Sequence, residues 1–529
     1  MNDMRSHDYP PRGEDAGSAA RRSILFDAPD VRRSAERREP PECFRDLNLD
    51  QIAAAVTAGR EAYDLLPIFH LPLTGAEAVR YRHEVFRDFE NPEVFACIAS
   101  FSERMRGVRA ALVETGKLHC QLQKQREHLD TIGEYCESVN ALTRALTLSQ
   151  LSSSGLMRLR QYLGEYTVSM EFGSLAAQTD ALQSDLAAIA YAVRIDGKRI
   201  EVSRYGGEPD YAAEVLETFA KFKQAAVDPR EFAFRNRSAM NHVEEAIVDR
   251  VARVFPGTFS SLAQYCERHR EFLDPVVAEF EREAQFYLAW LEYLKPLEKA
   301  GLRVCYPEVS AGARSSRCFA TFDLALAHRL LADRQTVVVN DFEWRVPERI
   351  MVVSGANQGG KSTFARLIGQ THYLAGLGCR VAGREAALPL VDHVLTHFER
   401  EERVETLSGK LEESLERMRR LLGRATSSSL LIMNESFDST TVKDALFLSR
   451  EILRRVTERD MLCVCVTFLD ELASLSERTV SYVATVNAED PATRTYRVVR
   501  RPAEGLAYAM AIAEKYGLTH ERVKERLST

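Results

Sequence analysis

The sequence lacks any apolar run close to the length that a lipid bilayer requires. A membrane-spanning helix needs roughly 20 consecutive, mostly apolar residues, and the apolar stretches here are short pieces such as 461–469. The N-terminal residues MNDMRSHDYPPRGEDAG place no apolar segment behind their charges, as a secretory signal would. We therefore expect no membrane partner and a protein that stays in the cytoplasm, where it is made.

Paired cysteines and an excess of positive charge are also missing. The 10 cysteines are scattered, with no C-x-x-C pair and no cysteine–histidine cluster at the spacing of metal ligands. We expect them to be reduced core residues. The formal net charge is −7, which excludes a generally basic coat for nucleic acid, so any DNA contact must be confined to one face.

The composition is that of a globular protein of several domains, with 529 residues, 45% hydrophobic and 28% charged. Residues 1–45 mix charged residues and proline with few aromatics, which predicts a flexible tail, apart from a short ordered piece at 23–26. Residues 46–300 repeat apolar positions at three- and four-residue spacing, which predicts mostly helix. Asp-Gly at 196–197 before alternating residues predicts a hairpin within that region.

The pattern changes near residue 301, where short β-rich runs begin to alternate with helical segments. This alternation predicts an α/β domain with a largely parallel sheet over residues 301–529, ending in a helical pattern from Gly505. The predicted strands are 336–339, 350–353, 430–433 and 462–467.

The strongest motif is G-x-x-x-x-G-K-[S/T] at residues 355–362. It lies between an apolar run and apolar residues at helical spacing, which is the strand–loop–helix context that the motif requires. Backbone N–H groups in such a loop turn toward phosphates, Lys361 is expected to reach the β- and γ-phosphates, and the Ser362 hydroxyl to bind Mg²⁺. We therefore predict ATP and Mg²⁺ as ligands. The residues predicted to bind the nucleotide in this segment are Gly355, Ala356, Asn357, Gln358, Gly359, Gly360, Lys361, Ser362 and Thr363.

A second run, 430–436, has the form of a Walker B strand, four apolar residues followed by polar ones. Asn434 stands where an Asp normally supports Mg²⁺. Its carbonyl oxygen can still accept from a metal-bound water, but it brings no charge, so we expect weaker metal affinity. Glu435 is placed to orient or deprotonate the attacking water, and with Lys361 it is our candidate for catalysis. The alternative is an ordinary carboxylate at a strand end.

A third feature lies between these two. Ser408-Gly409 opens a segment with apolar residues at 411, 415, 418 and 422, which predicts a helix with Ser408 as its N-cap. An exposed helix start attracts anions, and in ABC-type ATPases such a start completes the γ-phosphate site of the opposite protomer. The order of loop, helix and Walker B strand is the ABC order. An ordinary capped surface helix is the alternative.

With these motifs in place, residues 301–529 resemble the ATPase domain of the DNA mismatch repair MutS family. The loop SGANQGGKST is similar to that family's TGPNMGGKST, and LAGLGCRVAG to its LAQIGSFVPA. Asn340-Asp341 resembles the family's ND, and residues 392–397 resemble its D-x-I-F-T-R. The tail from Gly505 is similar to its closing S-Y-G-x-x-V-A-x-x-A-G-L segment. Residues 46–300 resemble its core and lever by class and position. The resemblance implies an ABC-type ATPase that forms a homodimer and binds DNA.

Three departures from the family pattern limit what the resemblance implies. Members that read mispairs carry an N-terminal domain with a Phe-x-Glu wedge, for which we expect no room here. The similar letters at 101–103 lie inside a helical pattern. The Walker B Asp is Asn434, and Phe468 stands where the family has a γ-phosphate-sensing His. Slow hydrolysis is therefore expected.

The leading hypothesis is an ATP-gated clamp for mismatched, branched or structured DNA in repair or recombination, with branched or structured DNA favoured over mispairs. The alternative is an ATP-binding switch or scaffold with negligible hydrolysis. An SMC-like ATPase is disfavoured because the helical part lies wholly before the loop. The candidates for phosphate contact, although charged runs on helices usually face solvent, are Lys198, Arg199, Arg204, Arg235 and Arg237.

Overall fold

The computed structural model describes residues 23–27, 39–197, 199–207, 240–399, 409–437, 440–487 and 494–503. The chain divides into two compact units. The first contains residues 1–11, 92–151 and 158–281, and the second contains residues 12–91, 152–157 and 282–529. Among the helices of the described ranges, none is both long enough and apolar enough to cross a bilayer.

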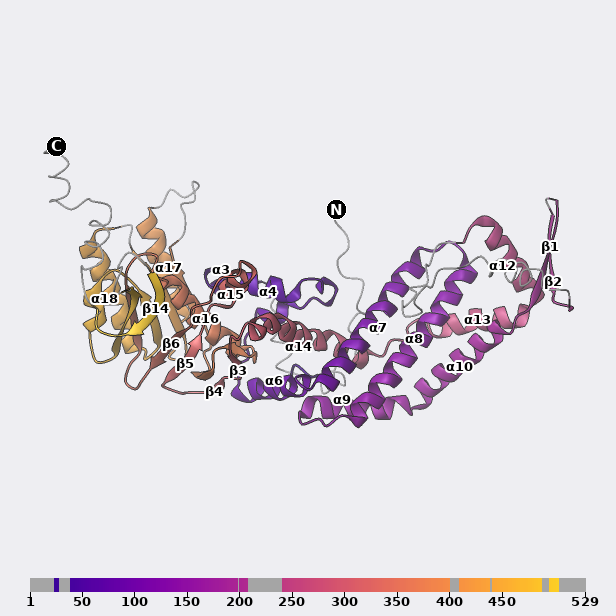
Figure 1. Ribbon diagram of the computed structural model, residues 1–529, viewed down its shortest axis with the longest axis horizontal. Helices are drawn as coiled ribbons and strands as arrows, with labels where there is room; N and C mark the ends of the chain where they lie inside the picture. The colour runs from indigo at the N-terminus through magenta and orange to yellow at the C-terminus, as the bar shows by residue number, and fades with distance from the viewer. Residues whose placement is uncertain are drawn as a thin grey trace. The chain divides into compact units, whose positions relative to one another are not determined.

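The first unit consists mainly of long helices (Figure 1). Helix α8 (Gln121–Leu148) buries residues at three- and four-residue spacing, among them Leu129, Ile132 and Val139, and it packs against α7, α10 and α13. The predicted helical character is therefore confirmed, and the Phe-Ser-Glu letters at 101–103 lie within α7. The described helices between residues 92 and 299 are α7 (Pro92–Lys117), α8, α9 (Ser154–Thr167), α10 (Met170–Ala187), α12 (His242–Val254), α13 (Pro256–Arg268) and α14 (Pro275–Lys299). Residues 154–157 of α9 and 282–299 of α14 belong to the second unit.

The predicted hairpin is present in this unit. Strands β1 (Tyr191–Asp196) and β2 (Arg199–Arg204) are antiparallel, and Asp196 is paired with Arg199 across the turn. Gly197 has a φ of 58°, the left-handed conformation that such a turn requires and that glycine adopts without steric cost.

The second unit is built around a six-stranded sheet with the order β10-β11-β12-β7-β13-β14. The first five strands are parallel neighbours, and β14 runs antiparallel to β13. The α/β prediction is therefore confirmed. The strands are β7 (Ile350–Gly355), β10 (Val394–Phe398), β11 (Leu430–Asn434), β12 (Leu462–Val466), β13 (Thr479–Val486) and β14 (Arg494–Arg500).

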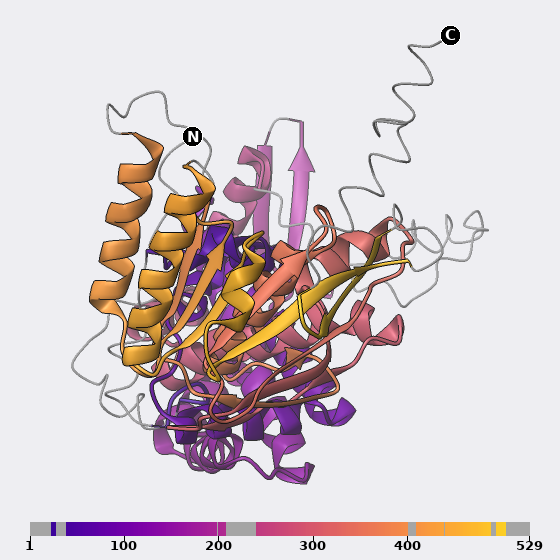
Figure 2. The same cartoon turned by 90° about the vertical axis from the view of Figure 1, so that its left-hand side faces the viewer.

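Helices cover both faces of this sheet. Alternate residues of β11 face opposite sides: Leu431 packs with the buried residues of α17 (Lys410–Arg424) and α18 (Val442–Glu458). Ile432 instead packs against Gly369 of α16 (Lys361–Gly376). In Figure 2, α17 and α18 lie side by side as two orange helices. A helix that follows the glycine-rich loop and a helix with the predicted signature-like start therefore lie on opposite faces of the sheet.

Smaller sheets complete the second unit. A four-stranded sheet has the order β4-β9-β5-β6, and β3 pairs with β8. The predicted strand at 336–339 is wrong: these residues pair with no strand, and β6 begins at Asn340, where its first residue pairs with Thr321. Their branched side chains suit a strand, but pairing depends on a neighbouring backbone. The remaining elements are β3 (Val304–Cys305), β4 (Glu308–Ser310), β5 (Ser316–Thr321), α15 (Leu324–Ala332), β6 (Asn340–Trp344), β8 (Val381–Ala382), β9 (Glu385–Pro389) and η2 (Asp470–Ser474).

Segments from the start of the chain also belong to the second unit. The ordered piece predicted at 23–26 is confirmed, since Ile24, Leu25 and Phe26 are buried. Its backbone is held by buried side chains: the Ile24 N–H donates to Glu283 and the Tyr287 hydroxyl donates to the Ile24 carbonyl. The helices that follow are α3 (Cys43–Asp46), α4 (Leu49–Thr57), η1 (Glu61–Tyr63), α5 (Leu66–Phe69) and α6 (Ala76–Phe89), so α3 begins just before the predicted end of the tail.

The second unit should lose stability in mild acid. Burial lowers the pKa of His83, His372 and His397 from 6.5 to about 4. Between pH 6.5 and 4 the unfolded chain therefore binds more protons than the folded one, and the free energy of unfolding falls as the pH falls. Each histidine contributes up to about 1.4 kcal/mol per pH unit. Denaturant titrations at pH 7.5, 6 and 5 measure the slope, and His372→Gln should reduce it by about one proton. Equal midpoints at all three pH values would contradict the prediction.

Candidate functional site

The polar residues of the predicted site follow three neighbouring parallel strands. Strands β7, β12 and β11 end at Gly355, Val466 and Asn434, and they are consecutive in the sheet. Because parallel strands end at the same edge, the loops after them meet there. The structure thus brings the glycine-rich loop, Glu435 and Phe468 together at the carboxyl edge of the sheet.

The loop after β7 needs its glycines for close backbone packing. Gly355 has a φ of 111°, and a Cβ there would lie 2.7 Å from the carbonyl oxygen of Ala484. A Cβ on Gly359 would lie 2.8 Å from the carbonyl oxygen of Ala356. Gly360, with a φ of 92°, is the N-cap residue of α16. The loop therefore leads into a helix start that carries no capping side chain, the arrangement that presents N–H groups to phosphate.

Lys361 is the first residue of α16, and its ammonium group is turned back onto the loop. It is only 4% exposed, and Nζ donates to the carbonyl oxygens of Gly355 at 3.0 Å and Ala356 at 3.2 Å. Burial lowers its pKa below the ordinary value, the charge of Glu435 opposes this shift, and Arg494 adds to it. The ammonium group is thus a partly desolvated cation beside the loop, which favours an incoming anion.

Phe468 covers the same ammonium group. The Lys361 Nζ lies 4.5 Å from the centre of the Phe468 ring, a cation–π contact. The ring is 50% exposed, and it follows Thr467, whose N–H donates to Val353 of β7. The residue that the sequence identified as a departure from the family pattern therefore contacts the candidate catalytic lysine directly.

Asn434 and Glu435 lie at the end of β11. The Glu435 N–H donates to the Val466 carbonyl at 2.9 Å, and Glu435 has a φ of 52°. A non-glycine residue in this conformation stores backbone strain, which is common at functional sites. The carboxylate acts electrostatically on Lys361. It therefore occupies a position at which a base can act on a water molecule beside the loop.

The residues predicted for Mg²⁺ fit a weakly held, hydrated cation. The side-chain oxygen Oδ1 of Asn434 is buried and has no hydrogen-bond partner, so it is an acceptor available to a metal-bound water. Ser362 and Thr363 lie in the first turn of α16. Within the described residues, no group of three or more His, Cys, Asp or Glu side chains is placed to hold a metal ion. The fit therefore rests on neutral oxygen ligands.

The helix predicted between the loop and Walker B strand is confirmed as α17. The predicted N-cap is wrong: the helix begins at Lys410, so its N-cap residue is the exposed Gly409 rather than Ser408, and glycine has no side chain to cap the free N–H groups. Ser408 itself lies outside the described residues. The first turn also contains Glu412 and Glu413. Their negative charges weaken the attraction of this helix start for an anion.

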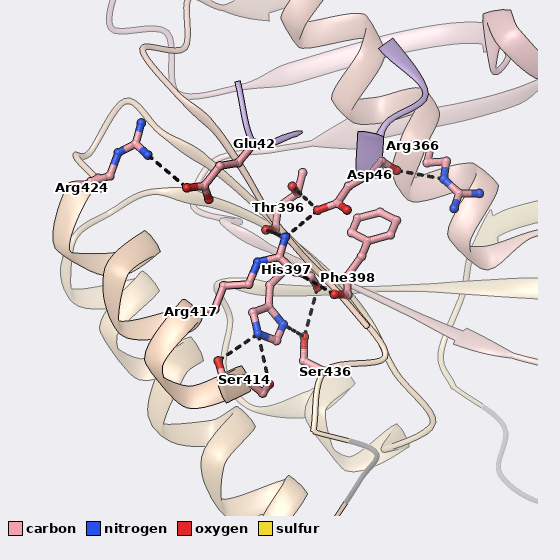
Figure 3. Close-up of polar contacts among 10 residues, drawn as sticks. All are labelled: Glu42, Asp46, Arg366, Thr396, His397, Phe398, Ser414, Arg417, Arg424 and Ser436. Atoms are coloured by element: carbon pink, nitrogen blue, oxygen red, sulfur yellow. Dashed lines mark hydrogen bonds and ion pairs between the residues drawn. The ribbon is translucent and has the colours of Figure 1, made fainter. Parts of the chain in front are cut away.

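Sequence reasoning missed a set of polar residues behind the site (Figure 3). The Asp46 carboxylate accepts from Arg417 of α17 and from the Thr396 hydroxyl of β10. His397 of β10 contacts Ser436, the residue after Glu435, and Ser414 of α17. His397 was visible only as the last letter of a motif, and nothing in the local pattern pointed to Asp46.

Comparison with known proteins identifies the domain that contains this site. Residues 351–527 match the family model of MutS domain V. Endonuclease MutS2 of Thermus thermophilus is 30% identical over 199 residues, which are 37% of this chain and 26% of that protein. DNA mismatch repair protein MutS of Chlorobaculum parvum is 24% identical over 430 residues, 77% of this chain and 46% of that protein. The chain spans less than half the length of each of these relatives.

Removal of the Lys361 ammonium group should weaken nucleotide binding. In Lys361→Ala we expect the ATP dissociation constant to rise at least about tenfold, because a charge-assisted contact is worth about 1.5–3 kcal/mol. Equilibrium titration with a fluorescent ATP analogue measures the change. Lys443→Ala, which removes an exposed lysine from the first turn of α18, is the control. Equal affinities of Lys361→Ala and this control would reject the assignment of the loop.

Proposed function

We propose that this chain, whose residues 351–527 match the family model of MutS domain V, is a MutS-family, ATP-dependent DNA-binding protein that hydrolyses ATP. The observation that carries the proposal is the convergence of Lys361, the glycine-rich loop and Glu435 at one edge of the parallel sheet. The DNA is mismatched, branched or otherwise structured, and hydrolysis is slow.

The loop residues bind and orient the nucleotide. Backbone N–H groups of residues 355–363 face the phosphates, and Lys361 exchanges its contacts with the loop carbonyls for contacts with the β- and γ-phosphates. Ser362 and Asn434 hold Mg²⁺ or its water shell. Bound there, the metal neutralises charge on the phosphates. The positive charge that the chain itself brings to this point comes from Lys361 and from Arg494, which donates to the Asn357 carbonyl of the loop.

Glu435 accepts the proton of the attacking water. Its carboxylate lies beside Lys361, and the turn that holds it is fixed by the hydrogen bond to Val466. A carboxylate at this point of the site can accept a proton from a water molecule beside the loop. Lys361 and Glu435 therefore have separate roles, the first in phosphate binding and the second in proton transfer.

Two protomers complete each site in this proposal. Helix α17 lies on the face of the sheet opposite to α16, so its start is available to the nucleotide of a partner rather than to its own. Ser408 and Gly409 supply that contact, and ATP closes a head-to-tail homodimer. Glu412 and Glu413, in the first turn of α17, repel the partner's γ-phosphate. Closure therefore depends on direct contact between the helix start and that phosphate.

The hairpin is the candidate DNA contact of the first unit. Arg199 and Arg204 are both exposed on β2, but the Arg204 guanidinium stacks on Phe255, 5.0 Å from the ring centre. Arg199 is therefore the better placed of the two for phosphate. The other three candidates, Lys198, Arg235 and Arg237, lie outside the described residues.

A panel of labelled DNA tests this function. Linear duplex, mismatched duplex, forked and four-way DNA are titrated with and without ATP at one stated salt concentration, since phosphate contacts make affinity strongly salt-dependent. We expect ATP to change the affinity for branched or mismatched DNA more than that for linear duplex. No binding to any of these DNAs would reject the DNA-binding part.

A second candidate function is an ATP-binding switch with negligible turnover. The contact between Phe468 and Lys361 favours it, because an apolar ring occupies a place where a hydrogen-bonding residue would sense the γ-phosphate. Single-turnover hydrolysis measurements distinguish the two. A rate no faster than that of free ATP supports the switch.

Replacement of Glu435 by Gln should separate binding from hydrolysis. Glu435→Gln removes the base with little change in volume, so ATP affinity should stay within about twofold while hydrolysis falls at least about a hundredfold. Phosphate release measures hydrolysis. Light scattering in the presence of ATP measures the size of the protein, and we expect a trapped dimer. Unaltered turnover in this variant makes Glu435 structural.

Mixed protomers test whether sites are shared. Ser408→Arg should bind ATP but fail to hydrolyse it, since the bulky side chain blocks the partner's nucleotide. Lys361→Ala should fail in binding. A mixture of the two variants should recover about one composite site per heterodimer. That site combines the intact loop of the Ser408→Arg protomer with the intact Ser408 of the Lys361→Ala protomer. Hydrolysis by the mixture but by neither variant alone supports the shared site. Full activity of Ser408→Arg alone would mean that α17 is an ordinary surface helix.

A further inference from the structure

A buried imidazole lies directly behind the turn that holds Glu435. His397 is the fourth residue of β10, which is the parallel neighbour of β11, and it is 3% exposed. Its Nδ1 lies 2.8 Å from the Ser436 hydroxyl, and its Nε2 lies 3.1 Å from the Ser414 carbonyl and 3.2 Å from the Ser414 hydroxyl (Figure 3). One ring therefore bridges the residue after Glu435 and the second turn of α17.

The partners of the ring determine where its proton lies. The carbonyl of Ser414 can only accept, so Nε2 carries the hydrogen and donates it. Nδ1 is then the acceptor, and the Ser436 hydroxyl donates to it. Burial, with a smaller effect from Arg417, lowers the pKa of His397 to about 4, in agreement with a neutral ring that makes both bonds at neutral pH.

The turn that His397 holds needs external support. Glu435 and Phe437 both have positive φ, at 52° and 67°, and each costs of order 1–2 kcal/mol for a residue with a Cβ. Ser436 lies between them. The Phe437 ring packs 5.7 Å from the imidazole centre and is 2% exposed. The histidine thus contacts two consecutive residues of a strained turn whose first residue is Glu435.

The other side of the ring is fixed to α17 by a second set of bonds. Arg417, one turn after Ser414, donates to the carbonyls of Thr396 and Phe398, the residues on either side of His397. It also donates to Asp46, whose carboxylate accepts from Thr396. Both charged partners are largely buried. This set of bonds fixes β10 and α17 to each other around the imidazole.

We propose that His397 is a positioning residue that couples the start of α17 to the turn that orients Glu435. This inference rests on the proposed ATPase function. Within one protomer, the ring connects the base acting on that protomer's own nucleotide to the helix that reaches the partner's nucleotide. Closure on one nucleotide therefore alters the position of the base beside the other.

The experiment uses the full chain and two readouts. His397→Leu removes the ring's contacts with Ser436 and Ser414 at similar volume. Ser436→Ala removes the hydroxyl that contacts the ring and, at 3.4 Å, the His397 carbonyl, but keeps the contacts with Ser414. His397→Gln keeps one donor and one acceptor on a planar group. His393→Leu is the control, because His393 precedes the same strand and is partly exposed beside Asp392. Hydrogen exchange of backbone amides reports local opening, and steady-state kinetics with a fluorescent-ATP titration report kcat and affinity.

In His397→Leu we expect faster exchange both in the turn at 435–437 and in the first two turns of α17. Ser436→Ala should speed exchange in the turn alone. Hydrolysis by His397→Leu should fall about 10- to 100-fold, as for a misplaced catalytic group, with ATP affinity within twofold. His397→Gln should recover part of the protection from exchange and part of the hydrolysis rate. The control should match the unmodified chain.

Unchanged exchange in both segments of His397→Leu overturns the proposal, whatever the ATPase does. Faster exchange with unchanged kcat also overturns it, since the ring would then be structural only. If the unmodified chain hydrolyses no ATP, the proposed ATPase fails and the positioning role fails with it, but the exchange data still report whether the ring couples α17 to the turn. A loss of ATP affinity equal to the loss of kcat assigns His397 to binding and rejects positioning.

Discussion

The candidate site depends on the alignment of three strand ends in one parallel sheet. Strands β7, β12 and β11 are hydrogen-bonded neighbours that run in one direction, so the loop before α16, the segment with Phe468 and the turn with Glu435 emerge at one edge. Gly355 is packed against Ala484 of β13 too closely for any other residue. The positions of Lys361 and Glu435 therefore follow from strand order and register, and a slip of one residue would turn every side chain of a strand to the other face.

The elements of this edge could be predicted from the sequence because their signals are local. The loop and the two apolar runs carry their pattern within about a dozen residues, and the periodicity of α17 is contained in the helix itself. The failed strand at 336–339 shows the limit of such signals. Its residues have the side chains of a strand but no backbone beside them to pair with, since the register of β5 and β6 begins at Asn340. Pairing is a property of two segments, and propensity describes only one.

The residues behind the site could not be predicted for the same reason. Asp46 and Leu47 come from the start of the chain, yet Arg366 donates to the Asp46 carbonyl, and Gln370 donates to the Leu47 carbonyl. A Cβ at Gly369 of α16 would overlap Leu47. No spacing in the sequence reports a contact over more than three hundred residues. These contacts nevertheless decide how α16 and α17 are held, since Asp46 bonds residues of both β10 and α17.

Asn434 changes the electrostatics of the site more than its small size suggests. With an Asp at this position, the edge would hold two adjacent carboxylates beside one lysine, and a divalent cation would be needed to offset their repulsion. With Asn434, the charges that act on Lys361 are the carboxylates of Glu435 and Asp470 and the guanidinium of Arg494, so the two signs are already matched before any metal arrives. The buried Oδ1 without a partner costs about 1–3 kcal/mol, a cost that any ligand with a hydrogen to donate removes. Under the proposed ATPase function, the site gains from a hydrated ligand while depending less on metal charge, and Phe468, in contact with Lys361, is the group that an incoming γ-phosphate would displace.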